Sequence, residues 1–176
     1  KVSIIIPNYN GRKYLGECID SLLHLDFPRE SYEIIVVDNS SSDNSSEFIL
    51  SMYPDVILIE AGKNLGFASG CNLGIKKSRG EYIVLLNNDT VVDTNWLKEL
   101  VAVVDGDDDI AIAGSKLLYK HNPNEIQNAM SYLTDKGDGG DMGSHQPDEG
   151  QYDSTREVMA VCGASMLIKR SLMEEI

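Results

Sequence analysis

The chain has 176 residues, 42% of them hydrophobic, and its 15 Lys and Arg against 28 Asp and Glu give a net charge of −13. This length supports one substantial hydrophobic core, so we expect a single domain. The acidic balance argues against nucleic acid as a partner, because such a chain repels a phosphate backbone. A phosphorylated ligand would therefore need backbone N–H groups, local cations or a metal ion beside it.

The cysteine pattern and the absence of long apolar runs predict a cytoplasmic location. Cys18, Cys71 and Cys162 are far apart and form no CxxC pair, which favours reduced thiols. No apolar run reaches the roughly 18 residues that span a bilayer, and the opening residues do not form a signal peptide. The sequence opens on a strand pattern and ends inside a helical one, so we expect the natural protein to be longer.

Four apolar runs rich in β-branched residues predict strands that are covered on both faces. The segments between them space their apolar residues as helices do. This alternation predicts an α/β fold with a Rossmann-like, mostly parallel sheet flanked by helices. The four predicted strands are residues 2–7, 32–37, 56–59 and 82–86.

The pattern continues beyond the fourth strand and then changes in composition. We expect a helix at 95–104 and two strands at 110–113 and 115–119. Residues 120–155 are rich in Gly, Asp, Asn and Pro, which predicts a long loop. Two more strands are expected at 158–162 and 165–168.

Polar, glycine and aromatic residues follow each of the four predicted strands. In open parallel sheets, ligands bind beyond the carboxyl ends of the strands, so these loops are the candidate site. Turn and helix-cap chemistry explains any one loop equally well. The loop residues are Asn8, Tyr9 and Asn10; Asp38 and Asn39; Lys63, Asn64 and Gly66; and Asn87, Asn88 and Asp89.

Asp89 is the candidate metal ligand, because it places a carboxylate at the end of a predicted buried strand. Mg²⁺ and Mn²⁺ take oxygen ligands and commonly use one or two carboxylates together with substrate phosphate oxygens. The alternative is a cap for the following helix, but Asp93 and Thr94 are better placed for that role.

Three further residues suit a nucleotide ligand, and each has a structural alternative. Asp38 can accept hydrogen bonds from a base imide or a ribose hydroxyl, or it can cap the next helix in competition with Asp43. Tyr9 offers a ring for base stacking, although a loop tyrosine is more often packed. Lys63 supplies a cation for a diphosphate, but it is equally compatible with a solvated side chain.

Several common nucleotide motifs are absent from the sequence. It contains no GxxxxGK[ST] loop, no GxGxxG after the first strand, no HExxH and no CxxC pair. P-loop hydrolysis and dinucleotide redox chemistry therefore lose support. A nucleotidyltransferase is a weaker alternative, because its glycine- and arginine-rich loop after the first strand is missing.

Taken together, these segments resemble family 2 glycosyltransferases, and most closely their rhamnosyltransferase-like branch. The resemblance lies in VSIIIPNYN, IIVVDNSSSD, NLGFASGCN, LLNND and CGASMLI, at residues 2–10, 34–43, 64–72, 85–89 and 162–168. It implies a GT-A fold, a UDP-, dTDP- or GDP-linked sugar donor, and Mg²⁺ or Mn²⁺. It also implies inverting transfer to a glycan or lipid-linked acceptor in surface polysaccharide synthesis.

The resemblance assigns roles to individual positions. Asp89 would hold the metal, and Gly163 and Ala164 would lie on the acceptor side. Asn88 departs from the acidic residue of the family's DxD-like signature, so metal affinity is expected to be weak. The implied nucleotide-sugar site comprises Pro7, Asn8, Tyr9, Asn10, Asp38, Asn39, Lys63, Asn64, Gly66, Phe67, Asn72, Asn87, Asn88 and Asp89.

The resemblance also predicts how the chain divides and what it lacks. Residues 1–104 would bind the nucleotide sugar, 120–155 would form a loop-rich excursion, and 157–176 would begin the acceptor-side part. The general base is expected beyond Ile176, because the resemblance implies that it belongs to an acidic motif some way past residues 163–168. Glu174 and Glu175 are alternatives, but they lie on a predicted helix and are expected to face solvent. This chain would then be poorly active, and a non-catalytic nucleotide-sugar-binding module is the alternative. We expect the longer protein to make peripheral contact with the inner face of the membrane.

Overall fold

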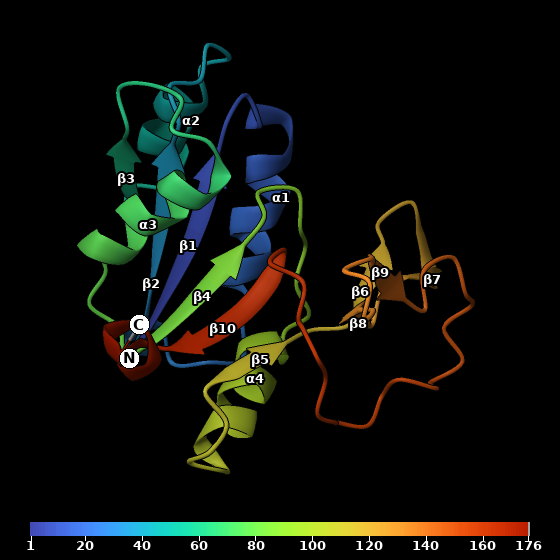
Figure 1. Cartoon of the computed structure of the whole chain (residues 1–176). Helices are drawn as coiled ribbons and strands as arrows, with labels where there is room; N and C mark the ends of the chain where they lie inside the picture. Colours follow the sequence, from blue (N-terminus) through green and yellow to red (C-terminus); the bar gives the residue numbers. More distant parts are fainter. Residues whose placement is uncertain (176) are drawn as a thin grey trace.

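The computed structural model describes the backbone of residues 1–175 and the side chains of residues 1–173. A six-stranded sheet in the order β3-β2-β1-β4-β10-β5 forms its centre, with helices on both faces (Figure 1). Its strands are β1 (Val2–Asn8), β2 (Tyr32–Asp38), β3 (Ile57–Glu60), β4 (Tyr82–Leu86), β5 (Ile112–Gly114) and β10 (Ser165–Lys169). The helices are α1 (Arg12–Leu23), α2 (Ser45–Met52), α3 (Phe67–Lys77), α4 (Trp96–Asp105) and α5 (Arg170–Glu175), and Arg29–Ser31 forms a 3-10 turn.

Strand pairing confirms the predicted mostly parallel α/β fold. β1 lies parallel to both β2 and β4, and β2 lies parallel to β3. The sequence pattern did not reveal that β10 inserts between β4 and β5 and runs antiparallel to both. In this register Ser165 lies opposite Leu86, so the start of β10 meets the end of β4.

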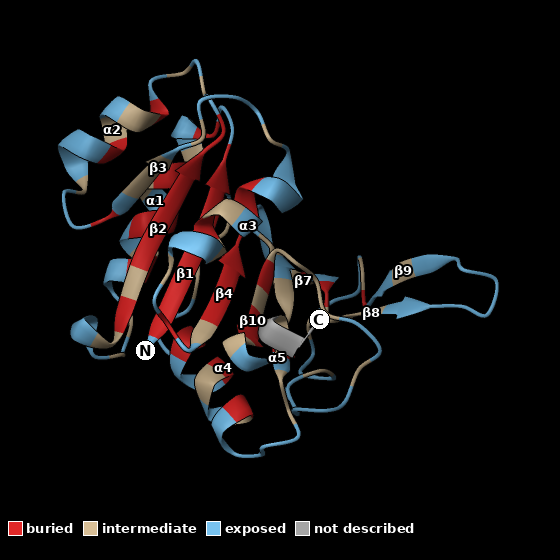
Figure 2. Ribbon diagram, turned by 60° about the vertical axis from the view of Figure 1, so that its left-hand side comes forward, coloured by how far each residue is buried: buried red, intermediate tan, exposed pale blue. Residues whose placement is uncertain are grey.

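The period-two alternation of the strands divides the core between the two faces of the sheet. Ile4 and Ile6 of β1 belong to a cluster with buried residues of α1, α2 and α4. Ile5 belongs to the opposite cluster, which includes Cys71 of α3. Because both faces are covered, the central strands are buried along almost their whole length (Figure 2). The continuous apolar runs in the sequence follow from this double coverage.

The strand expected at 115–119 is present as β6 (Leu117–Tyr119), and the segment 120–155 expected to be a long loop contains three more short strands; all four lie to one side of the main sheet (Figure 1). They form two antiparallel pairs: β6 with β7 (Asn122–Asn128), and β8 (Met130–Leu133) with β9 (Gly139–Met142). The glycines that suggested a loop serve these pairs, since Gly137 and Gly143 have positive φ values of 84° and 81°. The strand expected at 158–162 is wrong, because that segment contributes only an isolated bridge between Ala160 and Ser131.

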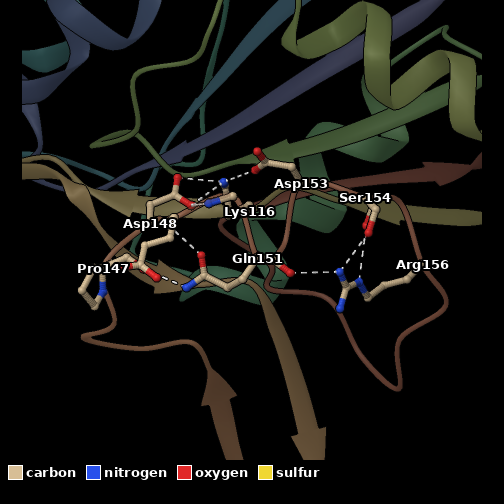
Figure 3. A network of polar contacts seen from close by, with 9 residues as sticks. Lys116, Pro147, Asp148, Gln151, Asp153, Ser154 and Arg156 are labelled. Carbon is tan, nitrogen blue, oxygen red and sulfur yellow. Dashed lines mark hydrogen bonds and ion pairs between the residues drawn. The ribbon is translucent and has the colours of Figure 1, made fainter.

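A network of polar contacts folds residues 147–156 back onto the connection after β5 (Figure 3). The Lys116 ammonium lies 2.8 Å from Asp148 and 2.5 Å from Asp153. The hydrogen bond from Lys116 lowers the pKa of Asp148 despite the opposing effect of burial. Arg156 donates to the Gln151 carbonyl at 3.2 Å, which closes the turn. Ion pairs and hydrogen bonds, among them the backbone hydrogen bond from Asp148 to Asn124 at 2.8 Å, therefore hold this segment.

Candidate functional site

The carboxyl ends of β1, β2 and β4 meet at one edge of the sheet, and Asn8 connects them. Its amide nitrogen donates to Asp38 Oδ1 at 2.9 Å, and its amide oxygen accepts from Asn88 at 2.7 Å. Asn8 and Asp38 are buried, with 1% and 3% of their surfaces exposed. The loops after β2 and β4 are therefore tied together through one buried side chain.

Asp38 is largely engaged by its own chain. Oδ1 accepts from Asn8 and from the Ser41 hydroxyl at 2.6 Å, while Oδ2 accepts from the Ser41 backbone N–H at 2.9 Å. A carboxylate oxygen offers two lone pairs, so Oδ2 keeps capacity for one ligand donor. Ser41 was missed in the sequence, because a hydroxyl within a run of serines carries no signal of its own.

The helix-cap alternative for Asp38 belongs instead to Asp43. Asp43 accepts from the backbone N–H of Arg12 at 2.8 Å and from that of Ser45 at 3.2 Å, so it joins the starts of α1 and α2. Partial burial opposes ionisation of this carboxyl. Hydrogen bonds from the Ser45 side chain and the two backbone groups outweigh that effect and lower the pKa of Asp43.

The loop after β4 is fixed on two sides and presents Asp89 to solvent. The Asn87 N–H donates to the Ala164 carbonyl at 3.0 Å, which ties this loop to the turn before β10. Asp93, not Asp89, accepts from the Asn95 N–H at 2.8 Å at the start of α4. Asp89 is therefore free of the capping role that was its alternative.

A divalent cation held by Asp89 would not be enclosed by protein ligands alone. The described side chains contain no group of three or more His, Cys, Asp or Glu residues that could hold a metal ion. Mg²⁺ and Mn²⁺ commonly bind through one or two carboxylates, with phosphate oxygens and water completing the shell. An exposed Asp89 fits that mode, and it does not fit a site made entirely of protein ligands.

Gly11 permits the close approach of α1 to this loop. A Cβ atom at Gly11 would lie 2.0 Å from Asn88 Nδ2 and 2.5 Å from Asn8 Oδ1. The φ of Gly11 is −104°, so the need for glycine is steric and not conformational. From the sequence alone, Gly11 cannot be distinguished from an ordinary turn glycine. Its role is visible only in the structure, where it packs against the hydrogen-bonded side chains of Asn8 and Asn88.

The loop after β3 and the first turns of α3 carry other residues of the predicted nucleotide-sugar site. Asn64 Oδ1 accepts from the Gly66 N–H at 2.9 Å, and Gly66 has a φ of 77° before α3 begins. Asn39 is buried and donates to the Gly66 carbonyl at 3.3 Å, so it links the end of β2 to the start of α3. Lys63 and Asn72 are exposed.

Two aromatic rings stand open at the loops that follow β1 and β3. Tyr9 has 53% and Phe67 has 51% of its surface exposed, so neither ring is packed in the core. Pro7 is buried within β1 opposite Val37, and Asn10 accepts from the Ser42 N–H at 2.8 Å. Pro7 and Asn10 therefore shape the loop, whereas Tyr9 and Phe67 offer faces to a ligand.

A cavity of about 410 Å³ opens beyond β2 and β3. Asp38, Glu60, Gly62 and the hydroxyl-bearing residues Ser41 and Ser45 contribute to its lining. This volume falls within the range of small-molecule sites, about 300–1,000 Å³. Of the residues predicted to bind the nucleotide sugar, Asp38 alone contributes to this lining.

Trp96 secures the turn that carries Gly163 and Ala164. Its indole N–H lies 2.9 Å from the Ser165 hydroxyl and 3.0 Å from the Ser115 hydroxyl. Gly163 and Ala164 are half-buried immediately before β10. The side chains of Glu174 and Glu175, which were predicted to face solvent, lie outside the described residues.

Comparisons of sequence show which proteins the chain resembles. Residues 3–176 match the model of Glycosyl transferase family 2. A poly(ribitol-phosphate) beta-glucosyltransferase of Bacillus spizizenii is 38% identical over 101 residues, which cover 55% of this chain and 16% of the relative. The glycosyltransferase GlyG of Streptococcus pneumoniae is 33% identical over 122 residues, which cover 67% of this chain and 40% of the relative. This chain thus spans less than half the length of either curated relative.

Solved structures with related folds include complexes with nucleotide sugars. Residues 1–349 of Staphylococcus aureus TarS in complex with UDP-GlcNAc align with a TM-score of 0.62 and 25% identity, covering 69% of this chain and 36% of that one. The mannosyltransferase PcManGT of Pyrobaculum calidifontis in complex with GDP-Man and Mn²⁺ aligns with a TM-score of 0.70 and 19% identity. That alignment covers 99% of this chain and 46% of PcManGT, and it supports the GT-A fold.

Proposed function

The chain belongs to glycosyl transferase family 2, and from that membership we propose that it binds the nucleoside-diphosphate sugar of a metal-dependent, inverting glycosyltransferase. The whole protein would transfer the sugar to a glycan or lipid-linked acceptor in surface polysaccharide synthesis. The poly(ribitol-phosphate) transferases among the relatives support a polymeric acceptor. The assignment to the rhamnosyltransferase-like branch and the identity of the donor's nucleobase stay predictions.

One observation carries this proposal: an exposed carboxylate stands at the end of a buried strand, on a loop held from both sides. The Asn87–Ala164 and Asn88–Asn8 hydrogen bonds fix the loop, while Asp89 remains open to solvent. A fixed backbone with a free carboxylate suits a cation that arrives with its ligand, because most of the cation's ligands then come from phosphate and water.

Asp89 would hold Mg²⁺ or Mn²⁺ at this edge. When bound, the metal would neutralise charge that develops on the diphosphate leaving group. PcManGT, solved with GDP-Man and Mn²⁺, supports this choice of cation. With Asn88 in place of a second carboxylate, we expect the affinity of the site for free metal to be weak.

The other edge residues would bind and orient the donor. The free lone pair of Asp38 Oδ2 can accept from a base imide or a ribose hydroxyl, and the exposed Tyr9 ring can stack on a base. Lys63, Asn64 and Phe67 would line the sugar-diphosphate side. Gly163 and Ala164 would border the acceptor, since their turn is hydrogen-bonded to the metal-binding loop.

We propose that the two ends of the chain have different roles. Residues 1–104 would form the nucleotide-sugar part, and residues 157–176 would begin the acceptor-side part. The general base would lie beyond residue 176, so this chain would bind donor with little turnover. No helix among residues 1–175 combines the length and apolar character needed to cross a bilayer. A cytoplasmic site at the inner face of the membrane, with peripheral contact, is part of the proposal.

Calorimetric titration tests the donor and metal assignments. UDP, dTDP and GDP are titrated in turn with and without Mn²⁺ into the wild-type chain, Asp89→Asn and the control Asp55→Asn, an exposed aspartate before β3. We expect manganese-dependent binding of at least one nucleotide by the wild type and the control. In Asp89→Asn the manganese dependence should be lost. Equal manganese-dependent binding by Asp89→Asn would contradict the metal assignment.

The location of the general base is tested separately, by measuring rates of sugar transfer. General acid–base catalysis contributes about 10²–10⁴-fold to rate, so a longer chain that includes the acidic residue should turn over faster by about that factor. Similar transfer rates for this chain and the longer one would place the base within residues 1–176. Nucleotide binding without transfer by the longer chain would favour a binding module.

A further inference from the structure

Two lysines, Lys13 of α1 and Lys120 from the connection after β6, lie beside the Tyr14 ring of α1. The ammonium groups of Lys13 and Lys120 lie 4.4 Å and 6.0 Å from the centre of the Tyr14 ring. Lys120 belongs to the turn after β6 and forms an ion pair with Glu17, which is 103 positions earlier in the chain. Both partners are solvent-accessible, with 50% and 64% of their side-chain surfaces exposed.

The same stretch of α1 contacts the loop that carries Asp89. Gly11, just before α1, packs against Asn88, and the Cys18 thiol donates to the Asn87 carbonyl at 3.7 Å. The loop therefore contacts α1 at Gly11 and at Cys18, and Glu17 precedes Cys18 on that helix.

The thiol of Cys18 experiences the charges of both Asp89 and Lys120. Burial raises the pKa of Cys18 to about 12, the charge of Asp89 adds to that rise, and the charge of Lys120 opposes it. The carboxylate and the ammonium thus lie within electrostatic range of one buried group. Its contacts with Tyr14 and Glu17 place Lys120 beside the stretch from Gly11 to Cys18 at the start of α1, where the Asp89 loop is in contact with the helix.

We propose that Lys120 is a second cationic contact for the donor diphosphate and that Glu17 holds its ammonium when no donor is bound. The inference rests on the proposed function of the Asp89 site. A divalent cation beside Asp89 leaves a net charge of about +1 and Lys63 would add one more, so a further ammonium group would still favour a diphosphate in a chain of net charge −13. Lysine binds phosphate as a flexible point charge, and an exposed ion pair is easily exchanged for a new partner.

The two partners should then act in opposite directions on nucleotide affinity. Lys120→Met keeps the length of the side chain and removes its charge, so it should weaken diphosphate binding roughly 3- to 10-fold. Glu17→Gln removes the competing carboxylate and should strengthen binding roughly 2- to 5-fold. If the pair merely tethered the excursion to α1, both variants would break the same tether and shift affinity in the same direction.

The experiment titrates UDP, dTDP and GDP with Mn²⁺ into the wild type, Lys120→Met, Glu17→Gln and the control Lys98→Met. Lys98 pairs with Asp26 in a similarly exposed ion pair beyond the far end of α1, with 56% and 68% of the two side-chain surfaces exposed. Thermal unfolding of each variant verifies that it is folded. Opposite shifts for the two variants, with Lys98→Met unchanged, support the inference.

Two results would overturn it, and they differ in what they say about the donor site. If a nucleotide binds the wild type and binds Lys120→Met equally well, or if both variants weaken binding alike, the inference is wrong and the proposed function stands. If none of the three nucleotides binds the wild type, the proposed function fails and this inference fails with it.

Discussion

Replacing Gly11 by alanine should disrupt the point at which α1 meets the two asparagines of the site. The added Cβ would lie 2.0 Å from Asn88 Nδ2 and 2.5 Å from Asn8 Oδ1, distances that no relaxed structure retains. Asn88 would have to rotate away, and the 2.7 Å hydrogen bond between the two side chains would be lost. The neighbouring Asp89 would be displaced with it.

The magnitude follows from these two effects. Overpacking in a tight region costs about 1–3 kcal/mol, and a lost side-chain hydrogen bond costs about 0.5–1.5 kcal/mol. Because Asn8 is buried, its oxygen could not turn to water in compensation. We expect Gly11→Ala to lower the free energy of unfolding by about 2–4 kcal/mol and to weaken manganese-dependent nucleotide binding.

Gly16, within α1, provides a control in which alanine should change the stability in the opposite direction. A Cβ there would make ordinary contacts, 3.5 Å from Phe48 Cζ and 3.7 Å from the Tyr53 hydroxyl. Alanine in a helix interior is favoured over glycine by about 0.5–1 kcal/mol, so Gly16→Ala should be slightly more stable than the wild type. Urea unfolding followed by circular dichroism measures both variants. A Gly11→Ala chain as stable as the wild type would refute the steric reasoning.

Two further substitutions test the supports around the site. Asp43→Asn leaves only one acceptor oxygen for the two helix starts and should lower the free energy of unfolding by about 1 kcal/mol at pH 7, as loss of one hydrogen bond does. Folding lowers the pKa of Asp43, so the carboxylate stabilises the folded chain above the ordinary pKa of 3.8, and this stabilisation is lost as the pH falls below that value. The free energies of unfolding of wild type and variant, measured by urea titration, should therefore become equal at low pH. Trp96→Phe removes the donor to Ser165 and should cost about 1–2 kcal/mol in urea unfolding, a loss that a surface position would not show.

The parallel part of the fold could be predicted because burial on both faces leaves a direct trace in the sequence. The runs at 2–7 and 82–86 match β1 and β4 closely, since apolar β-branched residues fill both sides of each strand. β7 left no such trace. Its residues Asn122–Asn128 are mostly polar, and Ile126 is its single buried apolar side chain. The antiparallel placement of β10 was equally hidden, because strand order depends on long-range packing and not on local periodicity.

The candidate site was predictable as a set of loops but not as a set of contacts. The carboxyl-end rule identified Asp38, Asn64 and Asp89 because each follows a predicted strand. Gly11 and Ser41 were missed, since turn glycines and serines look alike until their neighbours in space are known. The relation of Asp93 to α4 was predicted correctly from its position before the helix, and it left Asp89 available.

The pairing of β10 with β4 also bears on how the chain folds as it is synthesised. Until residues 165–169 leave the ribosome, β4 presents an unpaired edge, and Asn87 has no Ala164 carbonyl to bond. An open apolar edge strand is a template for pairing with other chains, so during this interval the nascent protein carries an edge that favours aggregation. The loop that would hold the cation thus reaches its final shape only after about eighty further residues have been added.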